Sequence, residues 1–528
     1  MEGKVMKKIY LFVICATAMI SCALLEENKD SFVSPDNFYK TESQARSGLN
    51  GCYIPLKSIY NNSFALAVEG CGDLMYCPSG TQDAQLDISP ANPRFGTTMW
   101  TQGYKGVRYC NDVIYALENS DALSAQTKAP YIAEAKVLRG LYYYLLTSFF
   151  GDVPFWTEPM LSFEVQKKVQ ELPRMSAYAT REWIVNDIKA IVDSLPAGRA
   201  YDVAQQRAGS AMAYTVMAKH AMWNASVSEG ETADTWWQTA SDALAKVELM
   251  YGALTEESYP LSDLRFSVKN TPESIFEIQH TYEPGGLSVT GNYACACMPY
   301  NTKHTEASAA VYDSVYVDFI GKNATPWAPY RPTQYFWDGL MPRSSKDRRM
   351  DDIMVWKWND RFFESFLTRN EAGEVTDSTY NKTPWMGPKF WCPNMYDTKD
   401  SNNYPVFRYA DVVLMQAECL CMLNRRTEAI DRLNAVKDRA DIDLLLYTAF
   451  RTKEKLMEEI QRERGRELIG EFQRKFDLVR WGTWYQAVLD NNNYLKQFDV
   501  RPCHEYYPIP DSECGLSGGA LKNEAYEK

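Results

Sequence analysis

The stretch that decides the fold class runs from 129 to 154 and reads APYIAEAKVLRGLYYYLLTSFFGDVP. Its apolar residues recur at helical spacing, from Ile132 through Leu138 to Phe149, so they share one face of a helix. Gly151 and Pro154 follow, and these residue types end helices because glycine accepts a left-handed backbone and proline cannot continue the turn. The sequence therefore predicts a helix over 129–150 that buries one side against neighbouring segments.

Similar patterns recur in both halves of the chain. We expect further helices over 43–60, 98–119, 176–195, 207–226, 233–250, 409–424, 427–440, 452–470 and 471–489. They come as adjacent pairs with short connections, and small residues such as Ala211 and Ala240 lie on the expected seams. Such pairs are typical of tetratricopeptide-like hairpins, which stack into a curved scaffold. The predicted fold class is mainly α.

The section from about 255 to 405 has a different composition. It is rich in Pro, Gly, Asn, Trp and Tyr and shows little helical periodicity. So much loop would be unusual in a pure helical solenoid, so we expect loops and short strands packed against the helical scaffold. No interdomain linker is visible. The prediction is one unit over 35–528, with helical parts at 35–254 and 406–528 and a loop-rich, ligand-facing part at 255–405.

Composition excludes several classes of function. The chain has 528 residues, 45% of them hydrophobic and 23% charged, as in ordinary globular proteins. Its net charge of −12 and the absence of a sustained Lys/Arg run argue against nucleic-acid binding. Four scattered His and no zinc-type Cys spacing argue against a structural zinc site. We expect no cofactor, while a structural Ca2+ stays open.

The N-terminus has the pattern of an export signal. Lys4, Lys7 and Lys8 precede an apolar run over 9–20 that is too short to span a bilayer as a helix. Residues 19–22, Met-Ile-Ser-Cys, resemble a bacterial lipobox, which implies a signal peptide over 1–21 and lipidation of Cys22. Residues 22–34 are then a polar tether. Several acyl chains hold a protein stably at a membrane, because each buried CH2 contributes about 0.8 kcal/mol.

A series of motifs resembles one family. The motifs are NFYKTE at 37–42, LNGCY at 49–53, AEAKVLRGLYYY at 133–144, FGDVP at 150–154, YPVFRYADVVLMQAE at 404–418, LNAVKDRA at 433–440, ERGREL at 463–468, FDLVRWG at 476–482 and YPIP at 507–510. In this order, and behind a lipobox, they are similar to the SusD/RagB family over most of the chain from about 35 to 528.

That resemblance implies a fold and a role. The fold would be four helical hairpins of tetratricopeptide type that support a loop-rich region with short strands. The protein would be a lipid-anchored lipoprotein on the cell surface of a Bacteroidetes-type outer membrane. It would bind oligosaccharides, or in some members peptides or other nutrients, and deliver them to a SusC-like TonB-dependent transporter. Members of the family have no catalytic residues.

The motifs also have a physical interpretation. Glu463 and Glu467 lie one helical turn apart, beside Arg464 and next to an apolar seam, which is typical of a structural ion-pair network. We expect Asp477 and Arg480 to belong to a network of the same kind. Arg139, inside its apolar stripe, is expected to pair with a neighbouring carboxylate.

Two loop clusters are the candidate ligand site. Sugar binding needs aromatic rings that pack on the C–H face of a pyranose, and polar side chains that satisfy its hydroxyls. Loops held on a rigid scaffold suit this role. The first cluster is Asp73, Tyr76, Gln82 and Asp83, in a region where the resemblance implies ligand contacts, because members of the family commonly have them there. The second cluster is Trp327, Tyr330, Arg331, Tyr335, Trp337 and Asp338.

Two other functions remain open from the sequence. A glycoside hydrolase needs only two carboxylates at a suitable separation, and the chain has 68 acidic residues. A protein-binding scaffold could use the concave surface of the helical hairpins. The pattern Gly-Leu-Ser-Gly-Gly at 515–519 fits the letters of a hydrolase nucleophile elbow, but no strand precedes it and no His follows it. We predict a binding protein and not an enzyme.

Overall fold

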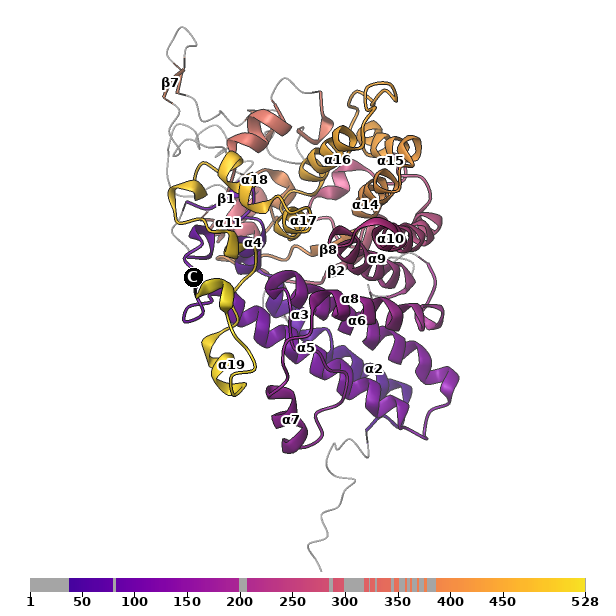
Figure 1. Cartoon of the computed structure of the whole chain (residues 1–528). Helices are drawn as coiled ribbons and strands as arrows, with labels where there is room; N and C mark the ends of the chain where they lie inside the picture. The colour runs from indigo at the N-terminus through magenta and orange to yellow at the C-terminus, as the bar shows by residue number, and fades with distance from the viewer. Residues whose placement is uncertain are drawn as a thin grey trace, which may run out of the picture.

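The structure is a computed structural model of the chain, shown in Figure 1. It describes residues 38–78, 82–198, 207–283, 288–298, 318–321, 323–327, 330–342, 346–350 and 386–527, and the backbone of short strands at 357–358, 361–362, 368–369 and 375–377. The predicted signal peptide, Cys22 and the tether lie outside these residues. Within the described ranges, no helix combines the length and apolarity needed to cross a bilayer.

The chain is mostly helical, as predicted. The N-terminal helices are α2 (Glu42–Gly51), α3 (Ile54–Ile59), α4 (Asn62–Val68), α5 (Phe95–Glu118), α6 (Ala125–Phe150), α7 (Phe163–Gln170), α8 (Ala177–Lys189), α9 (Ser210–Ser226) and α10 (Gly230–Tyr251). The C-terminal helices are α14 (Tyr409–Met422), α15 (Arg426–Arg439), α16 (Lys453–Leu468), α17 (Arg474–Arg480), α18 (Trp484–Asn491) and α19 (Asp511–Leu516). A short α11 (Ala294–Cys297) lies in the loop-rich part.

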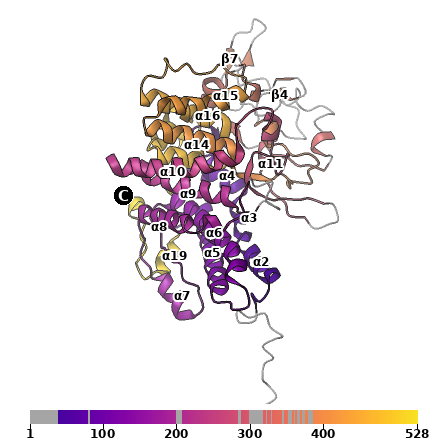
Figure 2. The ribbon, with the colours of Figure 1, turned by 90° about the vertical axis from the view of Figure 1, so that its right-hand side faces the viewer.

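Consecutive helices pack as neighbours in a stack. Helix α5 packs on α6, α9 on α10 and α14 on α15, and α10 joins the two halves by packing on α14. Figure 2 shows this order, with α14 to α16 above α10 and α9 and with α6 and α5 below them. A close approach at Gly106 tightens the first pair, because a Cβ there would lie 2.2 Å from the Tyr142 ring. The tetratricopeptide character of these pairs stays a prediction.

Two predicted helices are each divided in two, for a backbone reason. The segment 43–60 divides into α2 and α3, because Pro55 has no amide hydrogen to continue the first helix and instead stands in the first turn of α3. The segment 471–489 divides into α17 and α18 around Gly482, whose φ of +68° is unsuited to a helix interior. The helix predicted from 129 begins earlier, at Ala125, where Ser124 caps it.

Short strands join distant parts of the chain. Strand β2 (Ser274–Ile278) pairs antiparallel with β8 (Tyr404–Arg408), and β1 (Met75–Tyr76) pairs antiparallel with β3 (Arg331–Pro332). The remaining short pairs are β4 (Lys357–Trp358) with β5 (Arg361–Phe362) and β6 (Thr368–Arg369) with β7 (Val375–Asp377). The predicted arrangement of short strands beside the helices is therefore present.

The ion-pair network predicted around Glu463 and Glu467 is present, and it also ties the loop-rich part to the C-terminal helices. Glu467 of α16 pairs with Arg349 and Arg408, each at 2.7 Å, and with Arg439. All four side chains are buried. Burial alone would raise the pKa of Glu467, but the surrounding arginine charges outweigh it and hold that pKa well below its usual range. The carboxylate is thus charged at neutral pH.

The other predicted pairs form as well. Arg464 contacts Asp411 at 2.9 Å and Asp477 at 2.6 Å. Arg480 pairs with Glu418 and lies 3.4 Å from Asp477. In the first half, Arg139 reaches Asp187 of α8 at 2.6 Å. These charges hold the helices in register, and the backbone near the candidate site depends on them.

Candidate ligand-binding surface

The two predicted clusters, far apart in the sequence, meet at the β1–β3 pair. Tyr76 lies opposite Arg331 in the register of this pair. Thr333 fixes the junction, because its amide donates to the carbonyl oxygen of Leu74 at 2.8 Å and its hydroxyl donates to that of Asp73 at 2.7 Å. The same hydroxyl accepts the amide of Phe336 at 3.2 Å and so starts the helical turn Tyr335–Leu340. One backbone junction therefore positions both clusters.

Four of the ten candidate residues are buried. Tyr330 is fully buried and donates its hydroxyl to the carbonyl oxygen of Asn62 at 2.7 Å. Asp73 forms a two-point ion pair with Arg474, 2.8 Å at each oxygen. Tyr76 and Trp337 are also buried. These side chains stabilise the junction and offer little surface to a ligand.

The other six candidates reach solvent to different extents. Gln82 and Asp338 are exposed, and Asp83, Trp327, Arg331 and Tyr335 are partly buried. Asp83 accepts the amide of Phe95 at 3.2 Å and the hydroxyl of Tyr507 at 3.0 Å, and burial raises its pKa. These hydrogen bonds show that the Asp83 carboxylate stabilises the loop in which it lies. Trp327 donates to the sulfur of Cys295 at 3.2 Å and packs on a small second core around Trp391.

Around Tyr335 the polar groups converge. Gln334 and Asp338 are exposed on the same helical turn, and the Gln334 amide lies 3.3 Å from the Asp338 carboxylate. The partly exposed Arg462 of α16 donates to the carbonyl oxygen of Gly339 at 3.1 Å. The helical turn that carries the half-buried Tyr335 thus also presents an amide and a carboxylate, and the Arg462 guanidinium is bound to it. Such a set can pair with sugar hydroxyls.

A second group of rings, which the sequence interpretation missed, lies next to Tyr76. The Tyr494 ring is 5.4 Å from that of Tyr76 and 5.2 Å from that of Phe498. Both Tyr494 and Phe498 are partly exposed, and the side-chain amide of Gln85 donates to the Tyr494 hydroxyl at 3.3 Å. The signal in the sequence was weak, because the run Asn491–Tyr494 follows a helix and nothing links it to residue 76. We call Gln82, Arg331, Tyr335, Asp338, Tyr494 and Phe498 the candidate binding surface.

Two clefts lie away from this surface. One of about 720 Å3 lies between α2–α3 and β2, with Tyr53, Ile54 and Phe276 in its lining. A larger one of about 1490 Å3 lies beside α5 and includes Tyr115 and Leu161. None of the ten predicted residues lines either cleft. The candidate binding surface therefore lies outside these two clefts.

Ser517, the serine of the elbow-like pattern at 515–519, has structural partners. Ser517 is buried, donates its hydroxyl to the carbonyl oxygen of Cys514 at 2.7 Å and accepts the amide of Leu521 at 3.0 Å, so it caps the end of α19. The part of the chain that the structure describes has no group of three or more His, Cys, Asp or Glu side chains placed to bind a metal ion.

A helical scaffold that presents an aromatic and polar loop surface defines a class of binding protein, and comparison with known proteins identifies the family. Residues 273–526 match the model of the SusD family, and residues 25–252 match a model described as "Starch-binding associating with outer membrane". The chain belongs to the SusD/RagB family.

Relatives and solved structures agree over nearly the whole length. The chain is 23% identical to SusD-like protein P25 of Formosa agariphila, over 98% of each chain. It resembles the surface glycan-binding protein A of Bacteroides uniformis with a TM-score of 0.68 and 22% identity, over 92% of this chain and 100% of that one. The protein of the same name from Bacteroides thetaiotaomicron, solved with laminarihexaose, gives a TM-score of 0.67 at 19% identity, over 91% and 98%. At these identities the solved structures show a shared fold.

Proposed function

We propose that this protein binds oligosaccharides at the cell surface and delivers them to a SusC-like TonB-dependent transporter of the outer membrane. In this proposal the mature chain is held there by acyl groups on Cys22 and performs no catalysis. The family assignment supports this role, and so does the description of the N-terminal family model, which mentions starch binding and association with the outer membrane.

One observation carries the choice of site. The β1–β3 pair brings together residues of the two predicted loop clusters, and Tyr335 and Tyr494 near this pair are partly exposed. An aromatic ring excludes water from the apolar side of a pyranose, while neighbouring amide and carboxylate groups pair with its hydroxyls. The buried residues at the junction, including Asp73 and Tyr330, then act as support for these rings.

Calorimetric titration with defined oligosaccharides tests the site. Laminarihexaose is the first probe, because a solved structure of the same fold holds it. We expect Tyr335→Ala and Tyr494→Ala each to weaken binding about fivefold to tenfold, as loss of one ring contact implies. Tyr447→Ala is the matched control, since this tyrosine is 47% exposed on the loop between α15 and α16. Unchanged binding in both site variants would discard the site.

The alternatives give different results in simple assays. If peptides bind and no oligosaccharide in a broad panel does, the ligand is a peptide, and the proposed delivery to a transporter is unaffected. New reducing ends after incubation with polysaccharide would indicate a glycoside hydrolase instead. Affinity capture from detergent-solubilised outer membrane should retain a large β-barrel protein; recovery of soluble proteins in its place would favour a protein-binding scaffold.

A further inference from the structure

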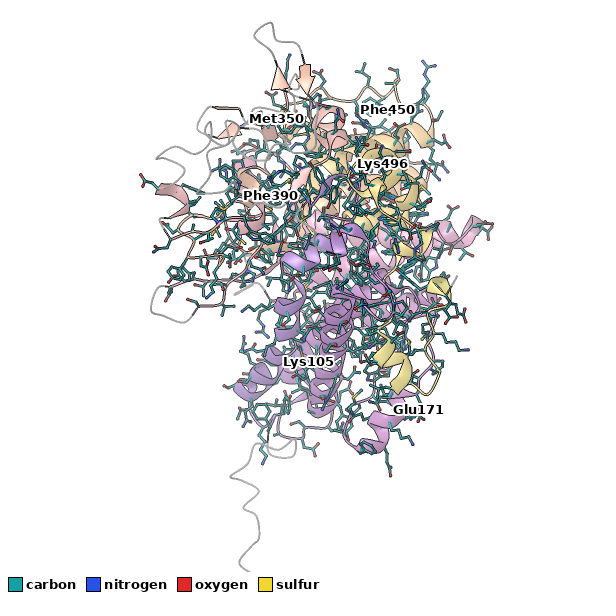
Figure 3. The ribbon with its side chains drawn as sticks, turned by 90° about the vertical axis from the view of Figure 1, so that its left-hand side faces the viewer. Lys105, Glu171, Met350, Phe390, Phe450 and Lys496 are labelled. Atoms are coloured by element: carbon teal, nitrogen blue, oxygen red, sulfur yellow. The ribbon has the colours of Figure 1, made fainter. Side chains whose placement is uncertain are left out.

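The end of the molecule that carries α7 exposes apolar side chains. Leu161 is 57% exposed and Phe163 is 78% exposed, on either side of Ser162, the N-cap of α7. Tyr115 of α5 is 40% exposed and lines the same cleft as Leu161. We call Tyr115, Leu161 and Phe163 the basal apolar patch. Figure 1 shows α7 at the lower end of the molecule, and in Figure 3 the labelled Glu171, which follows α7, lies far from Met350 and Lys496.

The patch is held firmly in this exposed position. The segment before it is tied to α5, because the amide of Met160 donates to Asp112 at 3.1 Å and the Asn111 side chain donates to the carbonyl oxygen of Trp156 at 3.3 Å. The Ser162 hydroxyl accepts the amide of Val165 at 3.3 Å and sets the start of α7. Val169, on the other side of this helix, is buried. An outward aromatic and an outward aliphatic residue are therefore fixed in water, which favours a partner that covers them.

The chain enters the described structure at the same place. Phe38, the first described residue, lines the cleft that Tyr115 and Leu161 also line. Sixteen residues lead from Cys22 to Phe38, and even fully extended they would span no more than about 55 Å. Acyl groups on Cys22 would thus keep this end of the molecule, more than any other, near the lipid surface.

We propose that the basal apolar patch inserts shallowly into the lipid surface to which the chain is anchored, and so sets the orientation of the protein. This inference rests on the lipid anchor of the proposed function. Protruding aromatic and aliphatic side chains next to long lysines are the pattern of a shallow interfacial contact, since the lysine stems can extend toward headgroups. Lys167 and Lys168 are exposed on α7 and lie 3.9 and 4.0 Å from Glu171 and Glu158. These balanced charges make apolar insertion, and not charge attraction, the main source of affinity.

Sedimentation with lipid vesicles tests the contact without the anchor. The chain from residue 22 onward, carrying Cys22→Ala, is mixed with vesicles of phosphatidylcholine alone or with added phosphatidylglycerol. We expect measurable partitioning that the double variant Leu161→Ser with Phe163→Ser lowers at least about tenfold. Adding phosphatidylglycerol should change the partitioning of the parent chain less than about threefold. Leu249→Ser is the control, because Leu249 is 82% exposed at the end of α10 and should leave partitioning unchanged.

Several outcomes would overturn the proposal. Equal partitioning of the double variant and the parent would do so, as would no partitioning of the parent. Loss of capture of a β-barrel protein by the double variant, without any effect on vesicles, would assign the patch to a protein partner. Calorimetry on the double variant tests glycan binding separately. We expect glycan binding to be unchanged, so failure of the membrane contact can be told apart from failure of the proposed function. Mass spectrometry of the native protein tests acylation of Cys22 on its own.

Discussion

The charge on Glu467 is expected to be essential for the stability of the fold, and Glu467→Gln tests this. The substitution keeps the shape and removes the charge that faces Arg349, Arg408 and Arg439, all of them buried. Breaking a buried ion pair costs about 3–5 kcal/mol, because the remaining charges are left without full compensation. Each arginine here keeps another carboxylate; Arg408, for example, also pairs with Glu273 at 2.7 Å. We therefore expect Glu467→Gln to lower the free energy of unfolding by about 3 kcal/mol, the lower end of this range.

The corresponding change in melting temperature follows from the size of the chain. Unfolding entropy of about 2.1 cal/mol/K per residue amounts to about 1 kcal/mol/K for 528 residues. A loss of about 3 kcal/mol then lowers Tm by about 3 °C, which differential scanning calorimetry resolves. The matched control is Glu428→Gln, in an exposed pair with Arg425 at 2.6 Å, for which we expect less than about 0.5 °C. Equal Tm values for the two variants would refute the assigned role of the network.

Three further predictions concern packing and pH. Gly106→Ala should lower the free energy of unfolding by about 1–3 kcal/mol, measured with a denaturant, because its Cβ would overlap the Tyr142 ring. Gly51→Ala is the control and should not destabilise the chain, because the space around Gly51 is open. Equal losses in the two variants would contradict the packing argument. Burial alone would raise the pKa of Asp411, but neighbouring Lys219 and Arg464 lower that pKa to about 2. The contribution of this carboxylate to stability is therefore complete above about pH 4 and should be lost as pH falls toward 2. A Tm that does not change over this pH range would contradict the prediction. Burial raises the pKa of Glu69 to about 7, so between about pH 4.5 and 7 the folded chain binds one proton more than the unfolded chain. The Tm should therefore fall as pH rises through that range. Glu69→Gln should reduce this fall, and a fall of the same size in the variant would show that another group causes it.

Local interactions explain why the helices could be predicted. The stripe from Ile132 to Phe149 records the helical period, and Gly151 marks the end of the helix. The predicted one-sided burial is wrong, because every residue from Val137 to Phe150 is buried once other helices surround α6. The ion-pair network could be predicted only in part: the spacing within α16 marked Glu463, Arg464 and Glu467 as its members, but their partners, such as Arg349 and Asp411, come from distant parts of the chain. Errors arose where one residue interrupts a longer pattern. Pro55 and Gly482 break helices that apolar periodicity alone continues.

The candidate site could be predicted only in part, because exposure is a property of the assembled chain. The family resemblance pointed to the first loop cluster and the aromatic content to the second. Neither could tell that Tyr330 would be buried under Asn62 while Tyr335, a few residues later, would remain partly exposed. Nor could either of them link Tyr494 to Tyr76, since their contact spans most of the chain.

The sequence alone was enough to assign the helical class and the family motifs, because both depend on residues close together in the chain. It also predicts an export signal and lipidation of Cys22 from a short local pattern. Tertiary structure decided which rings meet, which polar groups surround them and where apolar side chains stay exposed. These features depend on pairs such as β1 with β3, whose residues are about 255 positions apart and meet only after the helical stack has formed.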